Sequence, residues 1–371
     1  MSYVIVGGGI LGASTAYHLA KKGEQVTLID RNDQGQATDA AAGIVCPWLS
    51  QRRNKAWYQL VKNGARYYPE LVEALENDGE SNTGYKRVGT ISLHTDQNKL
   101  EKMVERAEKR REDAPEIGEI KLLSPEETKA MFPPLSEEYG SVYVSGGARV
   151  DGRAVRDALI SASKKYDATV VEGDAQLVAK DGRVTGVKVQ DDYIEATQVI
   201  DTAGAWSKQL VEPIGVDYDV STQRAQIIHL DLMGEDTADW PVVMPPSNAY
   251  LLTFSGGRVV VGATRTDYAG FDYRATAGGV REILDKALTV APGLDDASIL
   301  ETRVGFRPYT PGFLPIIGPM PNYEGLLVAN GLGATGLTAG PYLGSVLADL
   351  ATGEDVELDL SQYDVNEAIK Q

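Results

Sequence analysis

The chain has 371 residues, enough for two or three domains at about 150 residues each. Hydrophobic residues make up 43% and charged residues 24%, which is typical of folded globular proteins and excludes collagen-like and wholly disordered chains. The 36 basic and 53 acidic residues give a net charge of −17. Such a surface repels phosphate backbones, so we expect no nucleic-acid partner.

The composition also restricts location and metal binding. No apolar run approaches the roughly 18 residues of a membrane span, and a fold motif begins by Val4 with no cleavable apolar stretch ahead of it. We therefore expect a cytoplasmic protein without a membrane span. One cysteine, Cys46, cannot form an internal disulfide, and His18, His94 and His229 give no metal-ligand spacing, so we expect structural histidines and no metal.

The first thirty residues predict a strand, a helix and a second strand. Apolar residues at 3–6 precede the turn GGGILG at 7–12, a helix follows through Leu19, and residues 26–30 form the next strand. This order defines a βαβ unit.

Gly7, Gly9 and Gly12 form a GxGxxG motif between that strand and helix, where missing side chains let a pyrophosphate approach the backbone amides. Asp30 ends the second strand eighteen positions after Gly12, where a carboxylate accepts hydrogen bonds from ribose hydroxyls. This acid argues against a 2′-phosphate, although the adjacent Arg31 leaves NADP open. The motif therefore predicts a dinucleotide site.

The middle of the chain contains helical and extended segments. Residues 57–76 and 99–112 predict amphipathic helices, and we interpret the mixed charges at 109–112 as a solvated face. A hairpin turns at 181–182, and residues 221–262 are mostly extended, which predicts an antiparallel sheet.

Elements of the βαβ type at both ends enclose these extended segments. We therefore predict an α/β fold, with a Rossmann-like domain built from distant pieces and an inserted α+β domain on a large mixed or antiparallel sheet. The predicted nucleotide domain comprises residues 1–80, 141–218 and 306–371, and the inserted substrate domain comprises 81–140 and 219–305.

The motif GxGxxG serves both NAD and FAD, and three further features favour FAD. Residues 38–43 are small enough to pass close to a flat ring system. The segment 199–206 begins as an apolar strand and continues into small residues, where the backbone can approach a ligand. The loop 330–336 precedes a helix whose N-terminus can stabilise negative charge on a reduced flavin.

With these features the sequence resembles the D-amino acid oxidase family of flavoproteins, near glycine oxidase, the small D-amino acid dehydrogenases and monomeric sarcosine oxidase. The matching segments are GGGILG, TDAAAG from Thr38, GARVDGR from Gly147, DTAGAW from Asp201, GFRPYTPGFLPIIG from Gly305 and NGLGATGLTAGP from Asn330. The resemblance implies FAD in the Rossmann-like domain, a substrate domain on a large mixed sheet, and oxidation of a primary or secondary amine.

The residues expected to contact FAD come from both ends of the chain. They are Gly7, Gly9, Ile10, Leu11, Gly12, Asp30, Arg31, Thr38, Ala41, Ala42, Gly43, Ile44, Val171, Ala203, Gly204, Trp206, Arg307, Gly331, Gly333, Ala334, Thr335, Gly336, Leu337 and Thr338. Sarcosine oxidase relatives attach their flavin through a cysteine near the position of Phe306-Arg307. This chain has no cysteine there, so we expect noncovalent FAD.

Two residues are expected to act on the substrate. Arg307 matches the arginine that binds the substrate carboxylate in glycine oxidase, and a guanidinium does so with two parallel hydrogen bonds. Tyr250 matches the family tyrosine whose hydroxyl reaches the same carboxylate. A structural ion pair for Arg307 and a packing role for Tyr250 are the alternatives.

The surroundings of the substrate are expected to be apolar. Leu332, Ala334 and Leu337 fill the closing loop, which suits a hydrophobic side chain, and we place Trp48 and Met244 in the same pocket.

These features predict oxidative deamination of a D-amino acid, glycine or an N-alkyl glycine, by hydride transfer from the α-carbon to flavin N5. Oxygen or another acceptor takes the electrons. Oxidation of a 2-hydroxy acid or another alcohol is an alternative that the scarcity of histidines disfavours, because it requires a base. A non-catalytic flavin-binding protein is the other alternative. The sequence does not predict the oligomeric state.

Overall fold

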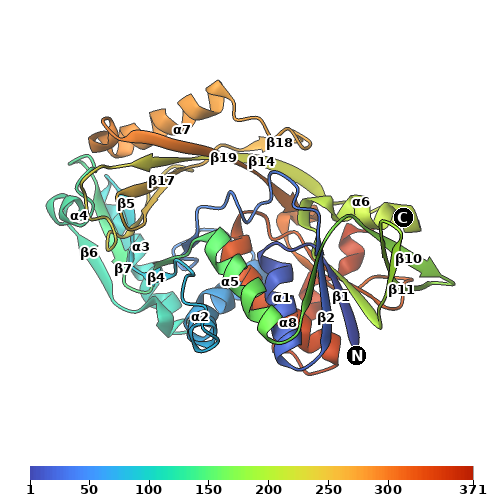
Figure 1. Ribbon diagram of the computed structural model, residues 1–371. Helices are drawn as coiled ribbons and strands as arrows, with labels where there is room; N and C mark the ends of the chain where they lie inside the picture. Colours follow the sequence, from blue (N-terminus) through green and yellow to red (C-terminus); the bar gives the residue numbers. More distant parts are fainter. Residues whose placement is uncertain (371) are drawn as a thin grey trace.

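The computed structural model describes residues 1–370, which form two large sheets with helices between and around them (Figure 1). The first sheet has six strands in the order β20-β21-β13-β1-β2-β9, all parallel to their neighbours except β20. Its strands are β1 (Ser2–Val6), β2 (Gln25–Asp30), β9 (Thr169–Glu172), β13 (Gln198–Asp201), β20 (Ile316–Pro319) and β21 (Leu326–Asn330). The predicted βαβ unit is confirmed.

Alternating side chains of β1 bury both faces of this sheet. Tyr3 and Ile5 pack in the core formed with the helices, whereas Val4 packs in the core formed with a small antiparallel sheet. The helices on the first face include α1 (Ile10–Lys21), α2 (Lys55–Asn77), α5 (Gly152–Lys165) and α8 (Gly336–Thr352). The small sheet consists of β10 (Ala175–Lys180), β11 (Arg183–Val189) and β12 (Asp192–Glu195).

The second large sheet has nine strands and is mixed, as predicted, because β5 and β15 run parallel. Its strands are β5 (Thr90–His94), β6 (Ile120–Leu123), β7 (Gly140–Val144), β14 (Ser221–Asp231), β15 (Val242–Met244), β16 (Tyr250–Thr253), β17 (Arg258–Gly262), β18 (Thr266–Asp267) and β19 (Ser298–Tyr309). Helix α7 (Ala277–Val290) packs on its outer face through Ile283 and Ala287 (Figure 1).

Smaller elements complete the chain. They are α3 (Gln97–Arg111), α4 (Pro125–Met131), α6 (Ser207–Val211) and the short strands β3 (Ile44–Val45), β4 (Lys86–Arg87) and β8 (Ala148–Arg149). Within residues 1–370, no helix is both long enough and apolar enough to span a bilayer.

Strand pairing refines two of the predicted domain boundaries. The boundary at residue 141 falls inside β7, which pairs with β5 in the large sheet, and the boundary at 306 falls inside β19, which pairs with β14 along its whole length. We therefore propose that the nucleotide-binding segments begin after Val144 and after Tyr309. The other boundaries stay as predicted.

Candidate active site

A cavity of about 770 Å³ lies where the two large sheets meet, within the usual range of ligand pockets. Its wall combines the opening glycines of the chain with the closing glycine-rich loop, although more than 300 residues separate them. The predicted cofactor and substrate residues that line it are Gly7, Gly9, Ile10, Leu11, Asp30, Arg31, Thr38, Ala41, Ala42, Gly43, Ile44, Ala203, Gly204, Trp206, Tyr250, Arg307, Gly331, Gly333, Ala334, Gly336, Leu337 and Thr338.

Three predicted contact residues lie outside this wall. Gly12 lets α1 pack against the preceding turn, because a Cβ there would lie 1.9 Å from a backbone oxygen. Val171 lies within β9, and residues 173–177 after that strand reach the cavity instead. The hydroxyl of Thr335 donates a hydrogen bond of 2.8 Å to Leu332 in its own turn. Their predicted contact with the cofactor therefore finds no support in the geometry.

The placement of Trp48 and Met244 in the cavity is wrong. Neither residue lines it: Trp48 is buried in the core with α1 and α5, and Met244 packs on an apolar cluster of the large sheet that the cavity-lining Tyr250 also contacts. Leu332, Ala334 and Leu337 do line the cavity, as predicted.

Two helix N-termini border the cavity. Helix α1 begins after Gly9 and α8 after Thr335, and neither has a side-chain cap or an acidic residue in its first turn. The amide of Ile10 donates to the Thr38 hydroxyl at 2.9 Å, which fixes the small-residue segment against α1. Each N-terminus carries roughly half a positive charge, so the wall favours anionic groups such as a diphosphate.

Asp30 ends β2 at the edge of the cavity. Its Oδ1 accepts hydrogen bonds from the backbone of Asn32 at 2.6 Å and from the Gln36 amide at 2.8 Å, and its Oδ2 accepts from the backbone of Gly8. A carboxylate has about four acceptor positions, so Asp30 can still bind a ribose hydroxyl.

The charge of Arg31 is already balanced. Its guanidinium lies 2.7 Å from Asp33 and 3.1 Å from Asp174, and both acids line the cavity. Because these carboxylates occupy the guanidinium, this end of the cavity favours a dinucleotide without a 2′-phosphate.

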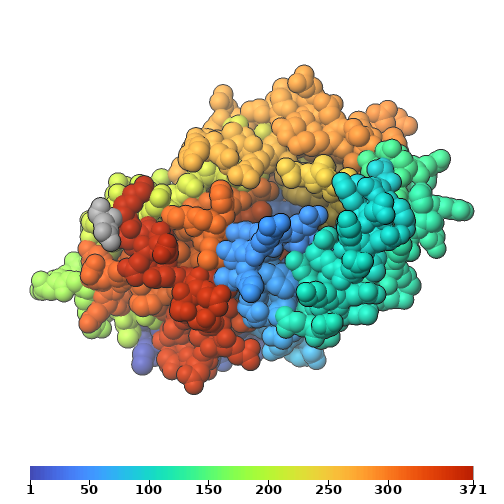
Figure 2. All heavy atoms as spheres, turned by 180° about the vertical axis from the view of Figure 1, so that it is seen from behind, coloured from blue at the N-terminus to red at the C-terminus, as the bar shows by residue number. Residues whose placement is uncertain are grey.

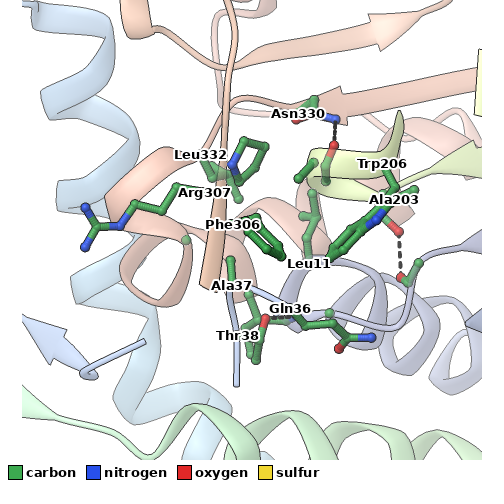
Figure 3. A pocket seen from close by; sticks show the side chains of 18 of the residues that line it. Leu11, Gln36, Ala37, Thr38, Ala203, Trp206, Phe306, Arg307, Asn330 and Leu332 are labelled. Atoms are coloured by element: carbon green, nitrogen blue, oxygen red, sulfur yellow. Dashed lines mark hydrogen bonds between the residues drawn. The ribbon is translucent and has the colours of Figure 1, made fainter. Parts of the chain in front are cut away.

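Arg307 marks the opposite end of the cavity. It lies in β19, where Phe306 and Arg307 point in different directions, and its guanidinium extends away from Trp206 (Figure 3). The guanidinium donates to the Gln223 side chain at 3.4 Å and forms no ion pair within residues 1–370. The alternative of a structural ion pair therefore finds no support.

Tyr250 and Gln223 accompany this arginine. Tyr250 faces Gly262 across β16 and β17, and a Cβ at Gly262 would lie 2.6 Å from the tyrosine oxygen, so the glycine makes room for the ring. Burial raises the pKa of Tyr250, and Arg307 acts in the opposite direction. The hydroxyl therefore stays protonated and can donate. Gln223, buried in β14 and also bonded to Asp267, was not predicted.

A buried carboxyl fixes the loop after β13. Oδ1 of Asp201 accepts from the Ala203 amide at 2.9 Å and the Ser207 hydroxyl at 2.8 Å, whereas Oδ2 has no partner. Burial raises the pKa of Asp201 to about 6. Asn330, the last residue of β21, donates to the Gly204 carbonyl at 2.9 Å and to Ser207 at 2.6 Å, so the ends of β21 and β13 are tied together (Figure 3).

These features fit FAD. The wall of small residues leaves room for its ring system, and the two helix N-termini favour its diphosphate. Asp30 can accept hydrogen bonds from its ribose. The residues that line the cavity include no cysteine or histidine for covalent attachment.

The cysteine and metal predictions can also be compared with the structure. Burial raises the pKa of the Cys46 thiol to about 11. Residues 1–370 contain no cluster of side chains suited to a metal ion.

Residues 2–350 match the DAO family, described as FAD dependent oxidoreductase, and the chain belongs to this family. It is an FAD-dependent oxidoreductase. The chain is 62% identical over 364 residues to uncharacterized oxidoreductase YurR of Bacillus subtilis, covering 98% of each chain. It is 29% identical to glycine oxidase of Pseudomonas putida, covering 97% of each. The crystal structure of iminodiacetate oxidase from Chelativorans sp. BNC1 superposes with a TM-score of 0.95 at 45% identity, covering 98% of each.

Proposed function

We propose that this protein oxidises the amine of an N-substituted glycine of the iminodiacetate type and passes the electrons to oxygen or another acceptor. One observation carries the proposal: Arg307 lines the cavity beside Tyr250 with no acidic partner in the described chain. A guanidinium in this state is suited to bind a carboxylate with two parallel hydrogen bonds.

The similarity to iminodiacetate oxidase favours a secondary amine over glycine itself. Identity to that structure is 45%, whereas identity to the Pseudomonas putida glycine oxidase is 29%. Iminodiacetate is glycine with a carboxymethyl group on its nitrogen, so it falls within the N-alkyl glycines, one of the three substrate classes that the sequence predicts.

In this proposal the chain positions and shields the substrate. Arg307 and Tyr250 hold one carboxylate, and the apolar Leu332 and Leu337 exclude water from the amine. Bound FAD would supply the two-electron acceptor for the hydride from the carbon next to nitrogen. The nitrogen loses a proton, and water hydrolyses the resulting imine to glyoxylate and a primary amine.

Alcohol oxidation has less support, because it requires a base near the reacting carbon. The acids that line the cavity are Asp30, Asp33 and Asp174, which belong to the nucleotide end, and no histidine lines it.

The cytoplasmic location of the protein remains a prediction.

Anaerobic reduction of the purified holoenzyme tests the proposal. Iminodiacetate, N-methylglycine, glycine and D-alanine are added separately, and bleaching of the flavin absorption is followed in time. We expect iminodiacetate to reduce the flavin fastest and to yield glyoxylate. Bleaching by no amine would refute the proposal, and faster bleaching by D-alanine would refute the proposed substrate class. Peroxide yield in air then distinguishes an oxidase from a dehydrogenase.

A further inference from the structure

A second hollow, of about 610 Å³, is strongly basic although the chain carries a net charge of −17. Five of the nine residues that line it are cationic and none is acidic. We call it the basic groove, and its residues are Gln51, Arg52, Arg53, Asn54, Lys55, Tyr58, Gln59, Arg106 and Arg110.

Aromatic rings and backbone carbonyls, not acids, contact two of these cations, Arg110 and Arg52. The Arg110 guanidinium lies 4.6 Å from the centre of the Tyr58 ring and donates to the backbone oxygen of Ser50 at 2.7 Å. That of Arg52 lies 4.8 Å from the centre of the Trp57 ring and donates to the backbone oxygen of Phe313. Across the described chain, none of the five cations forms a salt bridge.

The uncompensated charge is partly buried. Burial lowers the pKa of Arg110, and the like charge of Arg106 lowers it further. The Nε of Arg106 is itself buried without a hydrogen-bond partner. The prediction that residues 109–112 form a solvated face is therefore wrong for Arg110. A bound anion would relieve this repulsion and supply the missing partners.

The basic groove adjoins the substrate end of the cavity. Phe313, which Arg52 contacts, packs edge to face with Tyr309 at 4.9 Å between ring centres. Tyr309 follows Arg307 by two residues in β19, and its ring lies beside Gly333 of the cavity wall. In the rear view, the lighter blue atoms that follow residue 50 lie between the C-terminal and cyan parts of the surface (Figure 2).

We propose that the basic groove is a recruitment site for small anions with two or more carboxylates, from which an amine substrate of that class enters the flavin cavity. Recruitment through charge raises the rate of productive encounter without changing the chemical step. This inference rests on the proposed function for its substrate and on the unpaired cations for its location.

Charge reversal tests the recruitment step. We compare Arg53→Glu/Arg106→Glu with Lys164→Glu/Arg281→Glu, which makes the same charge change on exposed residues of α5 and α7 that line neither the cavity nor the basic groove. For iminodiacetate we expect at least a tenfold lower kcat/KM at low salt, with kcat within twofold of wild type and a weaker dependence on ionic strength. For N-methylglycine, with one carboxylate, we expect a smaller decrease. Equal decreases in both double variants, or none in either, would overturn the proposal.

A binding measurement separates this inference from the proposed function. Propane-1,2,3-tricarboxylate has no amine to oxidise, and its binding to the holoenzyme is measured by calorimetry. We expect binding by wild type and the control double variant, and loss by Arg53→Gln/Arg106→Gln, which avoids introducing negative charge. If this pattern holds while no amine reduces the flavin, the proposed function fails and the basic groove stands. If amines are oxidised and the tricarboxylate does not bind, the basic groove is refuted alone.

Discussion

Charged side chains have protein partners at one end of the cavity and lack acidic partners at the other. At the nucleotide end the wall is mostly backbone and small side chains, and the charged groups have protein partners: Asp30 accepts three hydrogen bonds and Arg31 pairs with two acids. At the substrate end Arg307 has no acidic partner in residues 1–370, and the basic groove lies nearby. Cofactor retention and substrate selection therefore depend on separate residues, and a single substitution should affect one without the other.

The largest effect is expected from Arg307→Met, which keeps much of the side-chain volume and removes the charge. Loss of a desolvated partner for a carboxylate costs roughly 3 to 4 kcal/mol, so kcat/KM should fall about 100- to 1000-fold. FAD content should not change. Steady-state kinetics with iminodiacetate and the flavin spectrum of the purified variant measure the two quantities. Unchanged kinetics, or loss of flavin with activity, would contradict the separation of the two ends.

The next effect is expected from Asp201→Asn at the nucleotide end. The pKa of this carboxyl is about 6 in the folded chain, above its ordinary value of 3.8, so the folded state binds more protons between those two pH values. Stability contributed by the protonated acid is therefore present at low pH and lost as pH rises through 6. The shift corresponds to about 3 kcal/mol.

Asparagine at this position does not titrate, and its oxygen can accept the same bonds from Ala203 and Ser207. Relative to wild type, Asp201→Asn should therefore gain up to about 3 kcal/mol between pH 4 and pH 8. Urea unfolding of the holoenzyme at several pH values measures this gain. A difference between the two proteins that stays constant with pH would show that Asp201 does not titrate as its burial implies.

The sequence predicts the nucleotide end well because its signals are local. The glycine turn follows β1, Asp30 ends β2, and the small residues at 38–43 lie between β2 and β3. Backbone geometry brings all three to the cavity at one edge of the parallel sheet. Asp201 and Asn330 are the last residues of the neighbouring strands β13 and β21, and both form hydrogen bonds with Ser207. Gly12 of the glycine turn and Val171 of β9 contact protein atoms rather than the cavity. Residue spacing in the sequence does not distinguish such packing contacts from cofactor contacts.

The substrate end is less predictable because its residues meet only through long-range pairing. Gln223 approaches Arg307 across 84 residues through the pairing of β14 with β19. Trp48 is buried in the core with α1 and α5, and its position in the sequence soon after residues 38–43 does not predict this burial. The basic groove combines the loop at 51–54 and the first turns of α2 with α3, so the charge run at 109–112 could not be interpreted without the tertiary contact between them.

The smallest effect is expected from Asp30→Ala, which removes the acceptor for the ribose. Loss of one hydrogen bond to a charged group costs about 1.4 kcal/mol, so the Kd for FAD should rise about tenfold. Asp30→Asn retains one acceptor oxygen and should lie between this variant and wild type. Asp285→Ala, which removes an exposed acid on α7 at the outer face of the large sheet, serves as the control.

Titration of each apoprotein with FAD gives the Kd, and kinetics at saturating FAD give KM for the amine. Because Asp30 and Arg307 lie at opposite ends of the cavity, Asp30→Ala should leave KM within about twofold of wild type while FAD binding weakens. Asp30 also accepts hydrogen bonds from Gly8 and Asn32, so disorder of this loop would weaken FAD binding as well. Urea unfolding of each apoprotein distinguishes the two causes, since a disordered loop lowers the free energy of unfolding without FAD, whereas loss of the ribose contact does not. A KM that rises together with the Kd in all variants would mean that the two ends act as one site.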